Sequence, residues 1–399
     1  MNKNCNQCGS FKISELLDFG LQPIVHHYLN SQGEPEEQYP FAMCFCKDCG
    51  LVQIVEPIAP EILYKNYITL SSWKSQPHIP HVIKALKKFP QFTKHSKIIE
   101  IGSNDGIFLK ALKEEGFDSM LGIEPAEDAR NSALSNGIES LGIFFNSKTA
   151  DEIVKTRGKF DIFLSRQNLE HIQDLKDFGL GINKILNPGA LVLIEVPNFG
   201  MNLNGPDYAF WEEHMNYFTN ESLTSYLASV GVKVRHSEII LFSGEALMVI
   251  GEYVGVDNVS PDYSYVNELV ARIESFKTNW ESYKKDINEK LKKFKKADKK
   301  IALYGAGARA TNFINFCEIG SLLECIVDDQ PEKQNKFLPG SRLPICGSEN
   351  LNSLGIDLCL LAVNAENEEK VISKHAKFLN NNGKFTSVFT PSSKLFDAW

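Results

Sequence analysis

A strand, a glycine-rich turn and a helix follow one another between Lys97 and Leu112 (KIIEIGSNDGIFLKAL), and this unit constrains the fold most. The apolar run before Gly102 predicts a buried strand, and the apolar spacing after Gly106 predicts a helix that begins at Ile107. Glycine lets the backbone approach a ligand closely, and the first turn of a helix offers unpaired N–H groups with a partial positive charge. We therefore expect a small polar ligand on the turn Gly102-Ser103-Asn104-Asp105-Gly106.

The strand after this unit narrows the choice of ligand. It ends in Glu124, where an open α/β sheet places a carboxylate that hydrogen-bonds a ribose diol. The G-x-G-x-x-G fingerprint is absent, which counts against a dinucleotide. The GSNDG turn followed by GIEP resembles the S-adenosylmethionine (SAM) site of class I methyltransferases. That resemblance implies that the Gly102 turn holds the methionyl end, that Asp105 is a polar contact, and that Glu124, next to Pro125, binds the ribose. A structural strand-turn-helix with a surface acid is the alternative.

Length, charge and cysteine content limit the number of domains, the kinds of partner and the cellular compartment that we expect. A chain of 399 residues is long enough for two or three domains. The net charge of −8 argues against nucleic acid as a partner. No apolar stretch is long enough to span a membrane, and the first residues, MNKNCNQCGS, lack the apolar core of a signal peptide. With nine cysteines that partly form CxxC pairs, we expect a cytoplasmic protein that binds metal rather than one with disulfides.

Two CxxC pairs near the N-terminus predict a metal site. Cys5 and Cys8 form the first pair, Cys46 and Cys49 the second, and glycine follows each. Four thiolates in this pattern suit one structural Zn²⁺, and with four protein ligands the ion has no open position for catalysis. We expect it to brace the fold, and we expect Cys44 to face away from it. A redox-active CxxC pair is the alternative.

The pattern of elements predicts an α/β protein with a zinc-binding domain before a Rossmann-like sheet and a second α/β domain after it. A hairpin between 237 and 255 completes the central sheet, and the Gly305-Ala306-Gly307 turn of the last domain suits a phosphate. Tyr67 lies among crowded aromatic and hydroxyl residues that form either a lid or interdomain packing. The expected segments are the zinc-binding domain (1–57), a helical connector or lid (58–95), the SAM-binding domain (96–255), a linking amphipathic helix (256–299) and the C-terminal domain (300–399).

Two further segments contain polar residues that are candidates for the active site. The strand Phe160–Leu164 precedes Gln167 and His171, which should fall near the cofactor because ligands bind at the carboxyl ends of parallel strands. Glu213 and His214 stand among aromatic residues, and a desolvated histidine held by a carboxylate suits a general base near neutral pH. For both histidines, a structural role in a cap or a packed loop is the alternative.

The chain as a whole resembles the nucleotide-sugar C-methyltransferases. The motifs that carry the resemblance are CNQCG…CKDCGLVQI, EIGSNDGIFL, GIEP, EEHMNYF and VDDQPEKQNKFLPGSRLPI, in family order over almost the entire chain. The resemblance implies a zinc-bearing N-terminal domain, a SAM-binding centre, and a nucleoside-diphosphate keto-sugar in a cleft between domains. It further implies that His214, preceded by Glu213, removes a proton beside the ketone, and that the enolate attacks the SAM methyl group.

Three positions differ from the family pattern on the side that binds the acceptor. Trp211 replaces a tyrosine, Gln167 replaces an asparagine, and Thr69 replaces the second tyrosine of a pair that begins with Tyr67. The sequence thus predicts a SAM-dependent methyltransferase of a nucleotide-linked sugar, a monomer or weak homodimer. O- or N-methylation of a related activated sugar, for surface glycans or natural products, is one alternative. A non-catalytic scaffold with a vestigial Rossmann unit is another.

Overall fold

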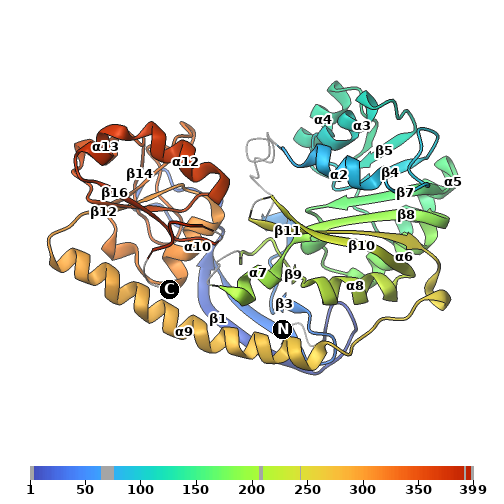
Figure 1. Cartoon of the computed structure of the whole chain (residues 1–399), viewed down its shortest axis with the longest axis horizontal. Coiled ribbons are helices and arrows are strands. Elements are labelled where there is room, and N and C mark those ends of the chain that lie inside the picture. Colours follow the sequence, from blue (N-terminus) through green and yellow to red (C-terminus); the bar gives the residue numbers. More distant parts are fainter. Residues whose placement is uncertain (1–3, 64–75, 206–209, 243, 391, 397–399) are drawn as a thin grey trace.

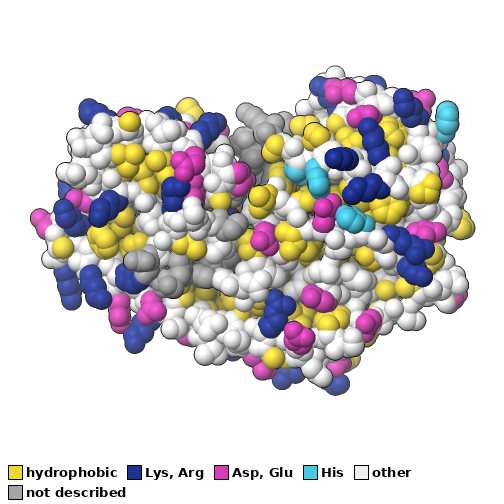
Figure 2. Space-filling model, in the orientation of Figure 1, with side chains coloured by type: hydrophobic (Ala, Val, Ile, Leu, Met, Phe, Trp, Pro, Cys, Tyr) yellow, Lys and Arg dark blue, Asp and Glu magenta, His cyan; other side chains and the backbone are white. Residues whose placement is uncertain are grey.

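The computed structural model describes residues 4–63, 76–205, 210–242, 244–390 and 392–396. Two α/β lobes stand side by side, with the N-terminal strands between them and a long helix along one edge (Figure 1). The predicted α/β class, with a central sheet and a second Rossmann-like domain, is confirmed. On the face shown in Figure 2, basic and acidic side chains are interspersed over both lobes. No helix in the described ranges combines the length and apolar character that crossing a membrane requires.

The N-terminal sheet takes one strand from a distant part of the chain. Its order is β1-β2-β3-β9, and all neighbours are antiparallel. The strands are β1 (Ile13–Pro23), β2 (Gln38–Cys46), β3 (Val52–Ile54) and β9 (Asn216–Tyr217). Strand β9 pairs Tyr217 with Val52 and Asn216 with Gln53. It begins two residues after His214, so the loop that carries this histidine is attached to the N-terminal sheet.

The four predicted metal ligands converge beside this sheet. The Sγ atoms of Cys5 and Cys49 are 3.4 Å apart, those of Cys8 and Cys46 are 3.6 Å apart, and all four lie within 4.8 Å of one another. Tetrahedral Zn–S bonds of about 2.3 Å separate sulfurs by about 3.8 Å, so this thiolate set fits Zn²⁺. Cys44 is buried and lies outside the group.

The central sheet has the strand order β10-β11-β8-β7-β4-β5-β6. Strands β8 to β6 in this list run parallel, and β11 and β10 are antiparallel to them, as the sequence predicts for the hairpin. The strands are β4 (Ile98–Ile101), β5 (Met120–Ile123), β6 (Ser140–Leu141), β7 (Phe160–Arg166), β8 (Leu186–Pro197), β10 (Val232–Leu241) and β11 (Glu245–Tyr253). The sequence analysis did not identify β6, whose two residues are too few to show a period.

Most helices of this part of the chain cover the sheet or follow its strands, whereas the first one packs its Leu63 against Ile24 and Ile58 of the N-terminal part. They are α1 (Pro60–Leu63), α2 (Ile79–Leu86), α3 (Ile107–Glu114), α4 (Glu127–Ser135), α5 (Ser147–Arg157), α6 (Leu175–Ile185), α7 (Phe199–Asn204) and α8 (Asn220–Ser229), with the short turn η2 (Leu169–His171) and, beyond β11, η3 (Val256–Asn258). Thr219 caps α8 together with Ser222, because each side chain bonds the other's backbone. Strand β4 lies between β5 and β7, so the chain order reverses there, and a ligand crevice is expected at the carboxyl ends of these strands.

The C-terminal sheet is parallel throughout, in the order β14-β13-β12-β15-β16. Its strands are β12 (Ile301–Tyr304), β13 (Cys325–Val327), β14 (Ile345–Cys346), β15 (Leu358–Leu361) and β16 (Lys384–Ser387). Its helices are α10 (Ala308–Phe316), η4 (Gly320–Leu322), α11 (Asn350–Ser353), α12 (Ala365–Lys374) and α13 (Ala376–Asn380). Strand β14 spans only two residues, too few to show a period in the sequence.

Helix α9 (Val266–Lys296) connects the two α/β domains and packs against all three parts of the molecule (Figure 1). Its buried residues recur at helical spacing and join the core shared by the N-terminal and C-terminal sheets. At its start, Leu269 packs on the second metal knuckle: a Cβ added to Gly50 would lie 2.5 Å from Leu269 Cδ2. The N-terminal domain is also hydrogen-bonded to the C-terminal domain. Tyr28 Oη donates to the Ala306 carbonyl at 2.5 Å, and Leu29 forms an isolated antiparallel β-bridge with Phe337.

Removing the metal from the cysteine site should loosen β9. A structural ion holds the knuckles together, Asn6 of the first knuckle donates to Gln53 and Asn216, and β3 pairs with β9. In Cys46→Ser, or after chelation, we expect amide hydrogen exchange at Asn216 and Tyr217 to rise at least tenfold. The internal control is the β12–β15 ladder, which should keep its protection. Equal protection of β9 with and without metal would contradict this coupling.

Candidate active site

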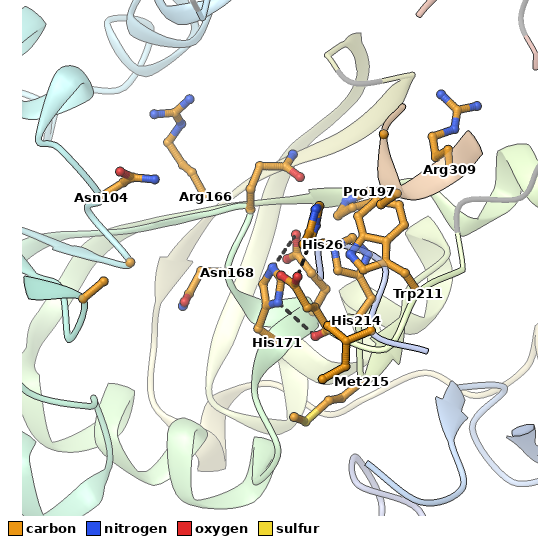
Figure 3. A pocket seen from close by; sticks show the side chains of 18 of the residues that line it. His26, Asn104, Arg166, Asn168, His171, Pro197, Trp211, His214, Met215 and Arg309 are labelled. Carbon is orange, nitrogen blue, oxygen red and sulfur yellow. Dashed lines mark hydrogen bonds and ion pairs between the residues drawn. The ribbon is translucent and has the colours of Figure 1, made fainter. Parts of the chain in front are cut away.

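One large cleft runs between the domains and has a volume of about 2170 Å³. Residues from the N-terminal loop after β1, from the carboxyl ends of β4, β5, β7 and β8, and from the C-terminal domain all line it. Figure 3 shows its sequence of groups, from Asn104 and Arg166 on one side, past His171, His214 and Trp211, to Arg309. A cleft that joins three domains can hold two ligands end to end.

The glycine turn after β4 forms the first wall of this cleft. Gly102 has a φ of +71°, and a Cβ at this position would lie 2.7 Å from Asn168 Oδ1, so both the conformation and the close approach require glycine. Asn104 also has a positive φ, of 50°, which asparagine tolerates better than most residues. Gly102, Ser103 and Asn104 line the cleft, as the SAM prediction requires.

Glu124 lies at the end of β5, beside this turn. Its carboxylate accepts hydrogen bonds from the backbone N–H groups of Asn104 at 2.9 Å and Ala126 at 2.8 Å, and burial raises its pKa. Each oxygen keeps a further lone pair, and Glu124 and Pro125 both line the cleft. The carboxylate therefore shapes the turn and still has capacity for a ribose diol.

Two predicted cofactor residues serve the turn itself. Asp105 Oδ1 accepts the Ile107 N–H at 3.2 Å, and Gly106 occupies the N-cap of α3 with a φ of +74°. Neither is among the residues that line the cleft. The direct contact predicted for Asp105 remains a prediction.

Glu100 and Arg166 line the cleft near the turn, and the sequence analysis did not identify them. Glu100 is buried, burial raises its pKa to about 8, and its Oε1 lies 3.7 Å from Arg166 Nη1. Glu100 stands two residues before Gly102 on β4, and an acid inside an apolar strand was the available signal. These groups offer a carboxyl group and a guanidinium beside the predicted methionyl end of SAM.

Arg166 belongs to a buried ionic network under the cleft floor. Its Nε lies 3.4 Å from Glu195 Oε2, its Nη2 lies 3.0 Å from His78 Nε2, and its guanidinium stacks on Phe108. Burial alone would raise the pKa of Glu195, but Arg166, His78 and Gln167 more than offset it, and that pKa falls to about 2. Gln167, at a φ of +48°, donates from Nε2 to Glu195 Oε1 at 3.2 Å and lines the cleft.

His171 and His214 meet in the middle of the cleft (Figure 3). Their rings are edge to face with centroids 4.8 Å apart, and the Trp211 ring lies 3.9 Å from His214. Burial lowers the pKa of His171 to about 4, and burial, then the neighbouring His171, lowers that of His214 well below its usual value. Both imidazoles are therefore neutral at physiological pH and have a lone pair available as a base or a ligand.

Backbone and acidic groups position these two rings. His171 Nδ1 donates to the Glu213 carbonyl at 2.9 Å, and the Glu213 carboxylate lies 3.3 Å from His26 Nε2. His26 comes from the loop after β1 and lines the cleft, and burial lowers its pKa to about 4. Glu170 is buried beside His171, and burial raises its pKa to about 8. His26 was not predicted from sequence, because only the fold brings its loop to the cleft, and Glu170 was not predicted although it directly precedes His171.

Hydrogen bonds from β9 fix the loop that carries His214. Met215 N donates to the Glu170 carbonyl at 2.8 Å, and Asn216 Nδ2 donates to the Ile172 carbonyl at 2.7 Å. The loops with His171 and His214 are thus tied together, and both are tied to the N-terminal sheet. Of the other predicted acceptor-side residues, Tyr67 and Thr69 lie outside the described residues.

The far end of the cleft belongs to the C-terminal domain. Cleft-lining residues here include Gly307 at the start of α10 and the cations Arg309, Lys333 and Lys336. Arg309 stacks on Phe389 at 4.1 Å and donates to Asn364 Oδ1 at 3.2 Å. Cations next to a helix N-terminus suit phosphate groups.

Comparisons with known proteins agree with this three-part organisation. Residues 5–64 match the family "Putative zinc binding domain", residues 75–237 match "Methyltransferase domain", and residues 266–389 match "C-methyltransferase C-terminal domain". The C-methyltransferase NovU of Streptomyces niveus is 26% identical over 99% of this chain and 97% of its own length. The ubiquinone biosynthesis O-methyltransferase of Azorhizobium caulinodans is 25% identical over 33% of this chain, which spans about half (52%) of that protein.

Among solved structures, a SAM-dependent methyltransferase from Mesorhizobium loti aligns with 42% of this chain and 96% of its own, at 16% identity and a TM-score of 0.35. The three family matches follow one another along the chain, and the match to NovU runs through all of them. The four cysteines lie close enough together to hold one metal ion, and the glycine turn and Glu124 line the cleft. The chain is therefore a SAM-dependent methyltransferase with a zinc-binding N-terminal domain, a methyltransferase core and a C-methyltransferase C-terminal domain.

Proposed function

We propose that this protein transfers the SAM methyl group to the carbon beside the ketone of a nucleotide-linked deoxysugar. The continuous cleft is the observation that carries the proposal. It has the cofactor turn at one end, two neutral imidazoles in the middle and three cations at the other end, where a diphosphate would bind. NovU is a C-methyltransferase, and this likeness supports transfer to carbon.

SAM binds on the Gly102 turn in this proposal. Glu124 receives the ribose hydroxyls, while Glu100 and Arg166 lie where the charged ammonium and carboxylate of the methionyl end need partners. SAM supplies a methyl group on a sulfonium, which a carbon nucleophile can take in line. The protein residues bind and orient both reactants and exclude water.

His214 is the general base of the proposed reaction. Its ring lies in the cleft between the cofactor turn and the cations, and desolvation keeps it neutral, so that it can accept the proton beside the ketone. His171 donates its Nδ1 proton to the Glu213 carbonyl and thereby holds its own ring edge against His214. Glu213 positions this pair from the backbone. Methylation at oxygen or nitrogen is the second candidate, because such acceptors already carry a lone pair.

Replacing His214 with alanine should lower turnover at least about 100-fold and leave SAM affinity unchanged, because a base acts on the acceptor and not on the cofactor. Turnover is measured as methyl transfer to a panel of nucleoside-diphosphate keto-deoxysugars, and SAM binding by calorimetry. The matched control is His236→Ala, an imidazole of β10 outside the cleft, which should retain full activity. In D₂O the native protein should wash deuterium into the position beside the ketone. Methyl transfer without such exchange would favour the oxygen or nitrogen route.

Two substitutions, one at each end of the cleft, should weaken the binding of different ligands. Glu124→Gln should weaken SAM binding roughly tenfold or more, because the amide loses the charge-assisted acceptor for the ribose. Arg309→Met keeps the apolar contact with Phe389 and removes the cation, so it should weaken the nucleotide sugar and spare SAM. Calorimetry with each ligand separates the two effects. If both variants weakened the same ligand, the assignment of the two ends would be wrong.

A further inference from the structure

Glu170 is a buried carboxyl group that the proposed reaction does not use. The residue is 1% exposed, and neither carboxylate oxygen accepts a hydrogen bond within the described part of the chain. Glu170 Oε1 lies 4.0 Å from His171 Nε2, and this distance is too long for a hydrogen bond. Burying a carboxyl group without a partner is costly, so its place beside the cleft calls for a ligand.

The neighbouring imidazole is arranged like a metal ligand. His171 Nδ1 donates to the Glu213 carbonyl, which leaves the lone pair on Nε2, the atom that faces Glu170. Histidines that bind metals usually donate the other ring N–H to a carbonyl or a carboxylate in this way, because the bond fixes tautomer and ring orientation. The ring is also held from its edge by His214.

His214 completes a set of three. One ligand atom from each of Glu170, His171 and His214 lies within 4.8 Å of the others. Metal–ligand bonds of about 2.0–2.1 Å place neighbouring ligand atoms about 3.4 Å apart, so small side-chain rotations would close the set around an ion. Two imidazoles and one carboxylate suit Zn²⁺, Co²⁺, Ni²⁺ or Fe²⁺, whereas Mg²⁺ and Ca²⁺ prefer oxygen ligands.

We infer that Glu170, His171 and His214 bind a divalent first-row transition-metal ion at a second site, separate from the four cysteines. The three residues line the cleft, so the remaining coordination positions of the ion face it and can take water or an oxygen ligand. The inference goes beyond the proposed function. Because the ion and the proton of the acceptor compete for the same lone pair of His214, an ion bound here inhibits the transfer reversibly.

The surface of the same domain offers a competing set of ligands, which serves as a matched control. His81 Nε2 and His236 Nε2 lie 3.0 Å and 3.1 Å from Glu238 Oε1, outside the cleft. Histidine side chains gather on this lobe in Figure 2. Two histidines and one glutamate are present in both clusters. In the surface cluster Glu238 Oε1 is hydrogen-bonded to His81 and lies within ion-pair distance of His236, whereas in the cleft neither Glu170 oxygen accepts a hydrogen bond from the described residues.

The test is a Co²⁺ titration of the full chain with one zinc per chain already in the cysteine site. Co²⁺ bound by nitrogen and oxygen shows weak visible bands, whereas Co²⁺ bound by four thiolates shows strong sulfur charge-transfer absorption, so the spectrum identifies the site. We expect the chain to bind one equivalent of Co²⁺ with the spectrum of nitrogen and oxygen ligands. Glu170→Gln should weaken it at least tenfold, since even outer-shell changes cost 10–100-fold in affinity, and Glu238→Gln should not. His214→Gln is the second variant and should weaken it likewise.

The opposite pattern would overturn the inference. Loss of Co²⁺ in Glu238→Gln with full binding in Glu170→Gln would place the ion on the surface, and absence of a second equivalent would remove the site. Melting temperatures of the variants show whether each one folds. Added Zn²⁺ should inhibit methyl transfer by the native protein, and EDTA should reverse this while one zinc per chain remains. Because the spectrum is read without substrate, failure of the metal site is distinguishable from failure of His214 as a base.

Discussion

The pairing of β3 with β9 is the interaction on which the rest of the site depends. It spans two residue pairs, yet it joins a loop of the methyltransferase core to the zinc-binding sheet. Alone, two ladder pairs contribute little, because each hydrogen bond adds about 0.5–1.5 kcal/mol net. Ile54 N also bonds the Met215 carbonyl, and Asn6 bonds Asn216. The metal knuckle thus fixes the backbone on the C-terminal side of His214, although four protein ligands leave the zinc no open coordination position.

In both α/β domains a carboxylate at the end of a strand accepts hydrogen bonds from the backbone of the glycine turn. In the core, Glu124 at the end of β5 accepts backbone N–H groups from the turn after β4 and from two residues downstream. In the C-terminal domain, Asp328 after β13 accepts the N–H of Ala306 at 2.7 Å and of Gln330 at 2.8 Å. A carboxylate that receives backbone donors fixes the conformation of its turn, because those N–H groups then have partners.

Local patterns in the sequence predicted most of the architecture. The strand-turn-helix at Gly102, the hairpin between 237 and 255 and the amphipathic helix before Lys299 depend on residues close in sequence, and these agree with the structure. Strands β6, β9 and β14 have two residues each and form only because a longer strand offers a free edge. No local period marks such strands, so tertiary pairing decides them.

The residues of the candidate site also divide into those that local sequence predicts and those that only tertiary contacts bring together. Glu124, His171 and His214 follow strands or sit in an aromatic loop, so pattern alone brings them to attention. Glu100 is an acid inside an apolar strand, a signal that a sequence carries but that has many structural causes. His26 lies in a loop of a different domain, and its position beside Glu213 follows from the whole fold. Residues that meet through long-range contacts cannot be paired from one sequence, because nothing local encodes the distance.

Several buried charges sit close together under the cleft, and their partners explain which of them are stable. Arg166 and Glu195 compensate each other, with His78 and Gln167 completing the network, so this pair is satisfied although it is almost completely buried. Breaking such a pair by removing one partner costs about 3–5 kcal/mol, which makes the network a rigid floor. Glu170 has no such partner among the described residues, and the imidazoles beside it are neutral. A protein tolerates groups of this kind where function needs them, because a set satisfied within the fold would have nothing left to offer a proton, an ion or a substrate.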